Sequence, residues 1–218
     1  MKSTFEAVTT LSGSAAALPL PHVDTDQIMP KQFLKGIGRQ GLAKGFLHGM
    51  RFDASGQMDP NFVLNRPPWC DAVFLITGPN FGCGSSREHA VWGLRELGIR
   101  CVLGTSFGGI FSDNCMRNGV PALELPVGQI ERLMALAQDP LRCNMTLHWA
   151  AQSLHSAGDD QTLHFDIDPL HKEMLLRGLD AVGMSLTHAQ DIRNFEERYL
   201  ASTPWARPTQ EKPHGSLL

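Results

Sequence analysis

The sequence predicts an α/β fold built around a parallel sheet. Short apolar runs at residues 72–77 (AVFLIT) and 99–104 (IRCVLG) alternate with segments whose apolar residues recur at helical spacing. Two consecutive strand-helix-strand units occupy residues 72–126, and such crossovers favour parallel strands covered by helices. With 218 residues, 42% of them apolar, we expect one domain over residues 1–200 and a flexible tail over residues 201–218.

The first part of the chain contrasts with this regular alternation. Residues 22–57 are rich in glycine, show little periodicity and are long for a connection, so they predict a mobile loop that could act as a lid. After the first strand and a glycine-rich stretch, Ala90, Val91, Leu94 and Leu97 have helical spacing, and Gly98 is placed to end that helix.

The second half alternates further elements before it changes pattern. Residues 106–119 predict a turn and helix, 120–126 a strand, and 129–138 a helix that ends near Pro140. Two extended pieces, 145–151 and 162–168, predict a hairpin around the turn-rich sequence SAGDD.

Two helices are expected at the C-terminal end. Asp168 before Pro169 predicts the capped start of a helix that runs to Gly178. Thr187 with Gln190 predicts a capping box for the last helix, on which a set of apolar residues lines one face: Ile192, Phe195 and Tyr199.

Charge and composition exclude several classes of partner. A net charge of -3 gives no electrostatic basis for binding nucleic acid or an anionic membrane, and no apolar run reaches the roughly 18 residues of a membrane span. The N-terminal 21 residues lack a continuous apolar stretch, so we expect no signal peptide. The odd number and irregular spacing of the five cysteines indicate a reducing, cytoplasmic location, with Cys101 as a core residue.

The stretch NFGCGSSREHA, residues 80–90, contains the residues best suited to bind an anion and to transfer a proton. A strand ends, glycines allow a tight turn, and a helix is expected to begin near Ser85 or Ser86. The N–H groups and dipole of a helix start favour an anion, and Arg87 can bind a carboxylate through two parallel hydrogen bonds. A serine hydroxyl in a dry cleft beside these groups can take part in proton transfer next to a carboxylate.

Other interpretations of the same residues stay open. The stretch can be turn chemistry and a helix cap alone, an anion or phosphate site, or a Cys83 nucleophile with His89 as its base. Asp24 and Asp26 could bind a cation, although two acids in a turn more often accept hydrogen bonds from their own backbone. The sequence predicts no metal site in this chain.

Three blocks of the chain resemble one family. Residues 80–126, together with VDTDQIMPKQFLK (23–35) and residues 165–199, closely resemble the small subunit of 3-isopropylmalate dehydratase, the swivel domain of the aconitase superfamily. The FGCGSSREHA motif is highly specific to that superfamily. The resemblance implies a layered β/β/α fold, and a hydro-lyase activity that interconverts 2- and 3-isopropylmalate through 2-isopropylmaleate in leucine biosynthesis.

The same resemblance implies partners and a cofactor. A 4Fe–4S cluster is expected on a separate large subunit, with no cofactor bound by this chain, whose cysteines form no plausible ligand set. The assembly would be a heterodimer or a dimer of heterodimers acting on a small dicarboxylate.

Residue roles follow from matching the motif positions. Ser85 is expected to be the catalytic base, Ser86 and Arg87 to bind a substrate carboxylate, and Gly82, Gly84, Glu88 and His89 to support the turn. A substrate-discriminating loop maps to residues 30–41, with these residues facing the substrate: Phe33, Leu34, Lys35 and Arg39. Departures from the family pattern, such as Val91 where proline is common, leave Ser85, Ser86 and Arg87 untouched. The alternatives are the small subunit of a related methylmalate, dimethylmalate or citraconate dehydratase, and a non-catalytic anion-binding module.

Overall fold

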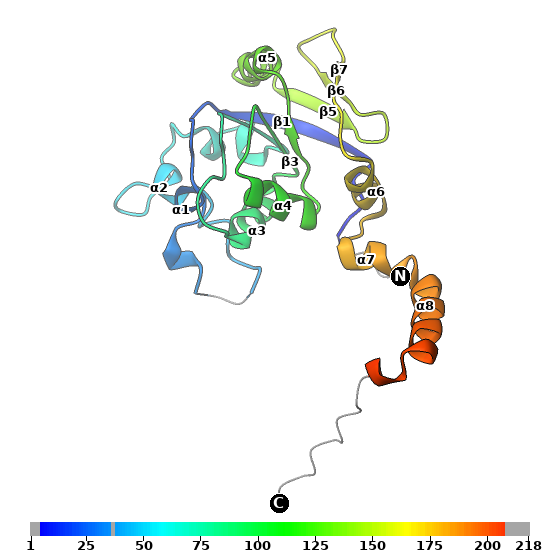
Figure 1. Ribbon diagram of the computed structural model, residues 1–218. Coiled ribbons are helices and arrows are strands. Elements are labelled where there is room, and N and C mark those ends of the chain that lie inside the picture. The colour runs from blue at the N-terminus through cyan, green and yellow to red at the C-terminus, as the bar shows by residue number, and fades with distance from the viewer. Residues whose placement is uncertain (1–4, 36–37, 208–218) are drawn as a thin grey trace, which may run out of the picture. The chain divides into compact units, whose positions relative to one another are not determined.

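The computed structural model describes residues 5–35 and 38–207, and the chain divides into two compact units, Met1–Asp180 and Ala181–Leu218 (Figure 1). The single domain expected over residues 1–200 stays a prediction. Most of the expected tail, residues 208–218, lies outside the described residues, and its beginning contains a short 3-10 helix, η4 (Pro204–Ala206). No helix in the described part of the chain is long and apolar enough to cross a membrane.

The first unit is built on a seven-stranded mixed sheet with the order β4-β3-β2-β1-β5-β6-β7. Strands β1 to β4 are mutually parallel, whereas β1, β5, β6 and β7 pair in antiparallel fashion. The predicted crossover units are confirmed. The strands are β1 (Thr10–Leu18), β2 (Phe74–Thr77), β3 (Cys101–Gly104), β4 (Ala122–Glu124), β5 (Asn144–His148), β6 (Ser153–Ser156) and β7 (Leu163–His164).

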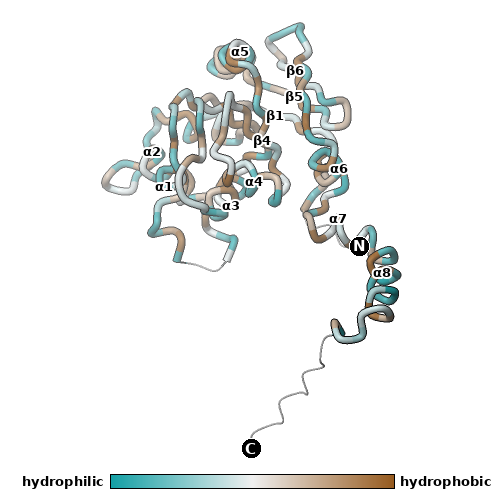
Figure 2. Tube along the Cα trace, viewed as in Figure 1, coloured by the Kyte–Doolittle hydropathy of each residue, from teal (hydrophilic) through white to brown (hydrophobic). Residues whose placement is uncertain are grey.

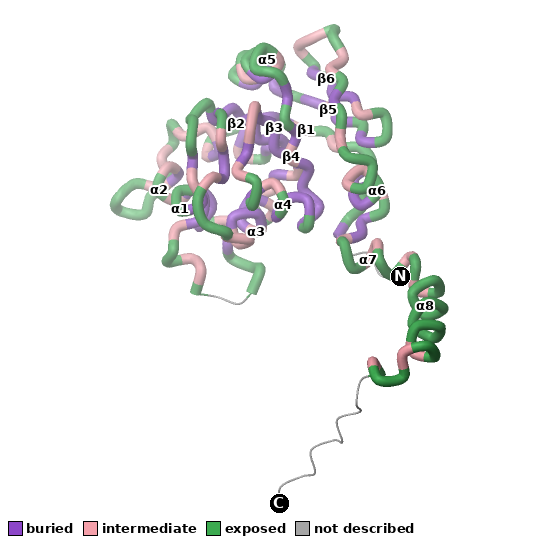
Figure 3. The backbone as a smooth tube through the Cα atoms, viewed as in Figure 1, coloured by how far each residue is buried: buried purple, intermediate pink, exposed green. Residues whose placement is uncertain are grey.

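The central strand β1 has no strong strand signal in its sequence, TLSGSAAAL, and sequence analysis missed it. Its alanines alternate between the two sides of the sheet: Ala16 belongs to one core cluster, and Ala15 and Ala17 belong to the other. The second half of β1, from Ser14 to Leu18, is buried, and Figure 3 shows the interior strands as buried. Small side chains here let both layers approach the sheet closely.

The two faces of the sheet carry different layers, as the expected β/β/α arrangement requires. One cluster packs the sheet against helices near the candidate site: α1 (Thr25–Ile28), α2 (His48–Arg51), α3 (Glu88–Leu97) and α4 (Gly109–Arg117). The other cluster joins the parallel strands to the antiparallel strands and two further helices: α5 (Val127–Ala137) and α6 (Pro169–Arg177). Brown, hydrophobic segments follow the strands in Figure 2.

The prediction of a mobile loop over residues 22–57 is wrong for much of that segment. Ile28, Met29, Phe46 and Leu47 are fully buried and belong to the helical-side core. Their apolar side chains are separated by glycines and short turns, so no periodic pattern announces them. The lid interpretation stays a prediction for residues 30–41, of which 36 and 37 lie outside the described residues.

The predicted hairpin near the end of the sheet is also corrected. Strand β5 pairs with β6, which was not predicted, and β6 then pairs with β7. Gln152 takes a positive φ of 51° in the turn between β5 and β6, where neither glycine nor proline marks a turn in the sequence. The turn-rich SAGDD therefore connects β6 to β7.

Of the two helix caps predicted near the C-terminal end, one is confirmed and one is wrong. Asp168 accepts hydrogen bonds from the backbone N–H groups of Leu170 and His171 at 2.9 and 3.1 Å, as predicted for the start of α6. In the second unit, α7 (Ala181–Leu186) precedes α8 (Ala189–Ser202), whose N-cap is His188. Thr187 instead donates to the Met184 carbonyl, so the predicted capping box does not form.

The loops that follow β2 and β3 pack tightly against each other and support the glycine-rich motif. The Gly108 N–H donates to the Phe81 carbonyl at 2.9 Å, and the Phe81 and Phe111 rings meet edge to face at 5.4 Å. A Cβ atom added at Gly108 would lie 2.4 Å from the carbonyl oxygen of Gly82. Only glycine allows this approach of two backbones.

We expect Gly108→Ala to reduce the free energy of unfolding by about 1 to 3 kcal/mol, because the new methyl group collides with backbone that cannot rotate away. The neighbouring Gly109→Ala is the matched control, since a Cβ at Gly109 meets nothing within 4 Å. Urea denaturation of both variants measures the difference. Equal stability of the two variants would contradict this packing.

The core on the antiparallel side supports a second prediction about stability. Leu147 is fully buried, so Leu147→Ala should cost about 2 to 5 kcal/mol through lost burial and the cavity it leaves. Leu141 is 88% exposed, and Leu141→Ala should change the free energy of unfolding by less than about 0.5 kcal/mol. Denaturation of the two variants side by side checks the placement of β5.

Candidate active site

The glycine-rich motif lies where β2 ends and α3 begins. Helix α3 starts at Glu88 with Arg87 as its N-cap, so the predicted start at Ser85 or Ser86 is two to three residues early. Gly84 has a φ of +98° and Arg87 has extended backbone angles, so the chain turns before it enters the helix. Ser85 and Ser86 therefore precede the first helical turn.

Gly82 is required by both its backbone angle and its surroundings. Its φ is +76°, a conformation that favours glycine, and an added Cβ would lie 2.3 Å from the Phe111 ring. The Phe111 ring of α4 therefore packs directly against the backbone of Gly82, at the start of the motif. The predicted supporting role of Gly82 stays a prediction, with this geometry in its favour.

The segment around α1 docks onto the motif through backbone hydrogen bonds. The Gly82 N–H donates to the Val23 carbonyl, and the Thr25 N–H donates to the Cys83 carbonyl, both at 2.8 Å. The buried Thr25 hydroxyl also donates to the Ser85 carbonyl at 2.8 Å. Two sequence blocks about sixty residues apart thus form one local structure, with the Ser85 backbone held in place.

The Arg87 guanidinium is anchored on α1. Its Nη1 donates to the backbone carbonyls of Met29 at 3.1 Å and Thr25 at 3.4 Å, and its Nη2 pairs with Asp26 Oδ1 at 2.5 Å. The Thr25 carbonyl also accepts from the Met29 N–H at 3.0 Å, so Arg87 adds a second donor there and supplies one to the Met29 carbonyl at the end of α1. The Nε–H has no acceptor among the residues that the structure describes, so part of the guanidinium is available to a ligand.

Both serine side chains of the motif are open to solvent. Ser85 and Ser86 are exposed, and neither hydroxyl has a hydrogen-bond partner within the described ranges. The backbone of Ser85 is fixed while its hydroxyl is free. The arrangement brings together an anchored guanidinium, two free hydroxyls and the start of a helix.

Glu88 bonds to the end of the neighbouring helix α4, whereas His89 packs on Trp92 within α3. Glu88 Oε1 accepts from the side-chain amide of the buried Asn118 at 2.8 Å, and Asn118 Oδ1 accepts from Trp92 Nε1 at 3.0 Å. The His89 ring packs on Trp92 with 4.7 Å between ring centres. These contacts hold α3 against the end of α4, which suits the predicted supporting role.

The residues predicted to face the substrate are spread along the 30–41 segment. The Phe33 ring lies 4.9 Å from that of His48, Leu34 packs on the core, Lys35 is exposed, and Arg39 lies over the Trp92 ring at 4.7 Å. No hydrogen bond between described residues joins any of these four to Ser85, Ser86 or Arg87. Their substrate role stays a prediction.

The end of this segment is tied to α3 by Glu96. Its carboxylate accepts from the backbone N–H groups of Gly41 at 2.7 Å and Ala43 at 2.8 Å. Desolvation favours the neutral form of Glu96, but the hydrogen bonds from residues 41–43 outweigh it and lower the pKa of this carboxyl. The ionised carboxylate therefore fixes the chain just after Arg39.

Sequence analysis missed the partners of Arg87. Asp24 and Asp26 stood out in the VDTD stretch, and Asp24 does accept from its own segment, the Gln27 N–H, at 2.8 Å. Asp26 instead pairs across the fold with Arg87. A pairing between distant segments leaves no local spacing signal, so the sequence alone could not reveal it.

The cysteines do not fit an iron–sulfur cluster. Cys101, Cys115 and Cys143 are buried, Cys70 and Cys83 are half-buried, and the described His, Cys, Asp and Glu residues include no group of three that could hold a metal. Burial raises the pKa of the Cys101 and Cys115 thiols, which disfavours the thiolate form that a metal requires. Cys101 is the core residue that was predicted. The Cys83 thiol lies 3.7 Å from the His22 carbonyl oxygen.

Family models match both units of the chain. Residues 5–128 match the aconitase C-terminal domain, and residues 182–209 match the C-terminal domain of the 3-isopropylmalate dehydratase small subunit. A crystal structure of 3-isopropylmalate dehydratase from Methanocaldococcus jannaschii covers 85% of this chain and 99% of its own, with a TM-score of 0.63 at 22% identity. The expected aconitase-type α/β fold is thereby confirmed.

Curated relatives are similar over nearly their whole length. The 3-isopropylmalate dehydratase small subunit 1 of Mannheimia succiniciproducens is 46% identical over 91% of this chain and 98% of the relative. The corresponding protein of Caulobacter vibrioides is 47% identical over 92% of this chain and 98% of its own. The chain therefore belongs to the family of 3-isopropylmalate dehydratase small subunits.

Proposed function

We propose that this chain is the small subunit of a 3-isopropylmalate dehydratase, a hydro-lyase that interconverts 2- and 3-isopropylmalate through 2-isopropylmaleate in leucine biosynthesis. The observation that carries the proposal is that an anchored Arg87 guanidinium and the free hydroxyls of Ser85 and Ser86 belong to three consecutive residues of one turn. A dicarboxylate substrate needs a fixed cation for a carboxylate and a nearby group that accepts a proton.

Arg87 is the proposed carboxylate-binding residue. Its side chain is 15% exposed, and the contacts with Thr25, Met29 and Asp26 hold its planar fork in one orientation. A fork that is already oriented loses less side-chain entropy when it binds a carboxylate. Asp26 is 59% exposed and acts as a positioning residue, because it holds Arg87 from the solvent side. Ser86 donates its hydroxyl to the same carboxylate.

Ser85 is the proposed base. Its Oγ, as the alkoxide, takes the proton from the carbon adjacent to the carboxylate, the C–H electron pair forms the double bond, and the hydroxide on the neighbouring carbon departs. The alkoxide is stabilised by the positive charge of Arg87 and by the N–H groups at the start of α3. Rehydration in the opposite orientation returns the proton and yields the isomer.

A large subunit is the proposed partner, in a heterodimer or a dimer of heterodimers in the cytoplasm. The serines are exposed in this chain, whereas a serine base requires a site from which water is excluded, so a second surface must cover them. The family resemblance assigns activation of the leaving hydroxyl to a 4Fe–4S cluster, which we place on that large partner because the described residues here offer no ligand set.

Ser85→Ala should lower kcat for 2-isopropylmalate by about 10² to 10⁴-fold, the usual contribution of a general base, while assembly with the large subunit is retained. Ser12→Ala is the control, because Ser12 is an exposed serine on β1 whose hydroxyl pairs with Thr146. Steady-state kinetics and gel filtration of the co-expressed subunits measure both effects. Near-normal turnover of Ser85→Ala would show that another group removes the proton.

Asp26→Asn should raise KM for 2-isopropylmalate by up to about five-fold with a smaller effect on kcat, since loss of a partly exposed ion pair loosens Arg87 by up to ~1 kcal/mol. Asp113→Asn removes an exposed carboxylate on α4 and serves as the control. A KM that falls instead would contradict the positioning role, because it would mean that Asp26 competes with the substrate for Arg87.

A further inference from the structure

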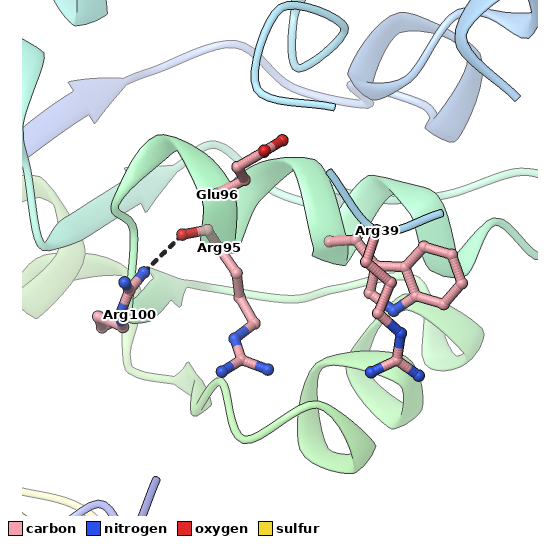
Figure 4. Close-up of a pocket in the computed structure, with 5 residues that line it drawn as sticks. Arg39, Arg95, Glu96 and Arg100 are labelled. Atoms are coloured by element: carbon pink, nitrogen blue, oxygen red, sulfur yellow. Dashed lines mark hydrogen bonds between the residues drawn. The ribbon is translucent and has the colours of Figure 1, made fainter. Parts of the chain in front are cut away.

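A second cationic site lies along α3. A pocket of about 230 Å³ is lined by Arg39, Trp92, Arg95, Glu96 and Arg100 (Figure 4). Liquid water occupies about 30 Å³ per molecule, so the pocket has room for a small ligand with several non-hydrogen atoms. Three of its five lining residues are arginines.

The pocket is separate from the candidate active site. Arg95 and Glu96 lie in the last turn of α3, and Arg100 directly precedes β3, at the amino ends of the parallel strands. Ser85 and Arg87 lie before the other end of α3, after the carboxyl end of β2. With a rise of about 1.5 Å per residue, the helix positions of Arg87 and Arg95 are roughly 12 Å apart.

The arginines of this pocket form no direct ion pair among the described residues, and Glu6 is the carboxylate that acts on Arg95. Glu96 directs its carboxylate to the Gly41 and Ala43 N–H groups, and Figure 4 shows it pointing away from the guanidinium groups of Arg39 and Arg95. Within residues 5–35 and 38–207, no ion pair involves Arg39, Arg95 or Arg100.

The three arginines differ in what holds them. Arg100 Nη1 donates to the carbonyls of Arg95 at 2.6 Å and Ile99 at 3.1 Å, and Arg39 lies over the Trp92 ring. The Arg95 guanidinium has no hydrogen-bond partner among the described residues. Burial, followed by repulsion from Arg100 and Arg39, lowers the pKa of Arg95 against a smaller opposing effect of Glu6. A bound anion would relieve this repulsion.

We propose that Arg39, Arg95 and Arg100 form a binding site for a small phosphoryl-bearing anion. Guanidinium groups match phosphate oxygens through paired hydrogen bonds, and a doubly charged phosphoryl group balances several neighbouring cations better than one carboxylate does. The Trp92 ring and the arginine stems supply apolar wall for the rest of the ligand. This site stands independently of the proposed catalytic role of Ser85.

Isothermal titration of the full chain with inorganic pyrophosphate tests the proposal. We expect saturable binding by the wild type and affinity at least about ten-fold weaker in Arg95→Gln, because a charge-assisted hydrogen bond is lost. Arg66→Gln is the matched control, since Arg66 lies over Trp69 at 4.8 Å as Arg39 lies over Trp92, but does not line this pocket. Arg87→Gln should also bind normally.

Several results would overturn the site. Absence of saturable binding by the wild type would mean that the chain has no such anion site. Equal binding by Arg95→Gln, or loss of binding in Arg87→Gln, would place the anion elsewhere. Citrate titrated in parallel should bind more weakly, and tighter binding of citrate would reject a phosphoryl ligand. Arg39→Gln, which changes an exposed residue, provides a second variant should Arg95→Gln fail to fold, and must also weaken binding.

Discussion

The candidate active site depends on the bonding of Arg87 to α1. This guanidinium lies before α3, yet the carbonyls of Thr25 and Met29 and the carboxylate of Asp26 decide where it points. The same short helix holds the Ser85 carbonyl through the Thr25 hydroxyl. Because both anchors come from α1, a shift of that helix would move the proposed carboxylate-binding group and the proposed base together, and their relative placement would survive.

Much of the regular scaffold could be predicted from local sequence. The helix from Glu88 to Leu97, the strands on either side of it and the Asp168 cap all follow from periodicity and end signals. Strand β1 could not be predicted in this way, because alanine, serine and glycine carry little strand preference, and its place between β2 and β5 is set by packing on both faces. The buried residues around α2 could not be predicted either, because glycines and short turns separate them and leave no periodic pattern.

The residue types of the site could be predicted from the sequence, but the hydrogen bonds and ion pairs between distant segments could not. Glycines, serines and an arginine at a strand-to-helix turn indicate an anion site, and the family resemblance assigns roles to Ser85 and Arg87. The pairing of Asp26 with Arg87 joins segments that only the folded sheet brings together. The pocket formed by Arg95 and Arg100 was not predicted, because charged residues at a helix end usually face solvent. Arg39 lines the same pocket only because of the path that the long connection takes in the folded chain.

A crystal structure of this chain with the proposed large subunit and 2-isopropylmalate would show whether Ser85 and Arg87 reach the substrate as proposed. We expect Ser85 Oγ within about 3.5 Å of the carbon that loses its proton. We also expect Arg87 to donate to a substrate carboxylate while its Nη1 stays on the carbonyls of Thr25 and Met29. A Ser85 hydroxyl turned away from the substrate, or an Arg87 released from α1 in the complex, would contradict these expectations.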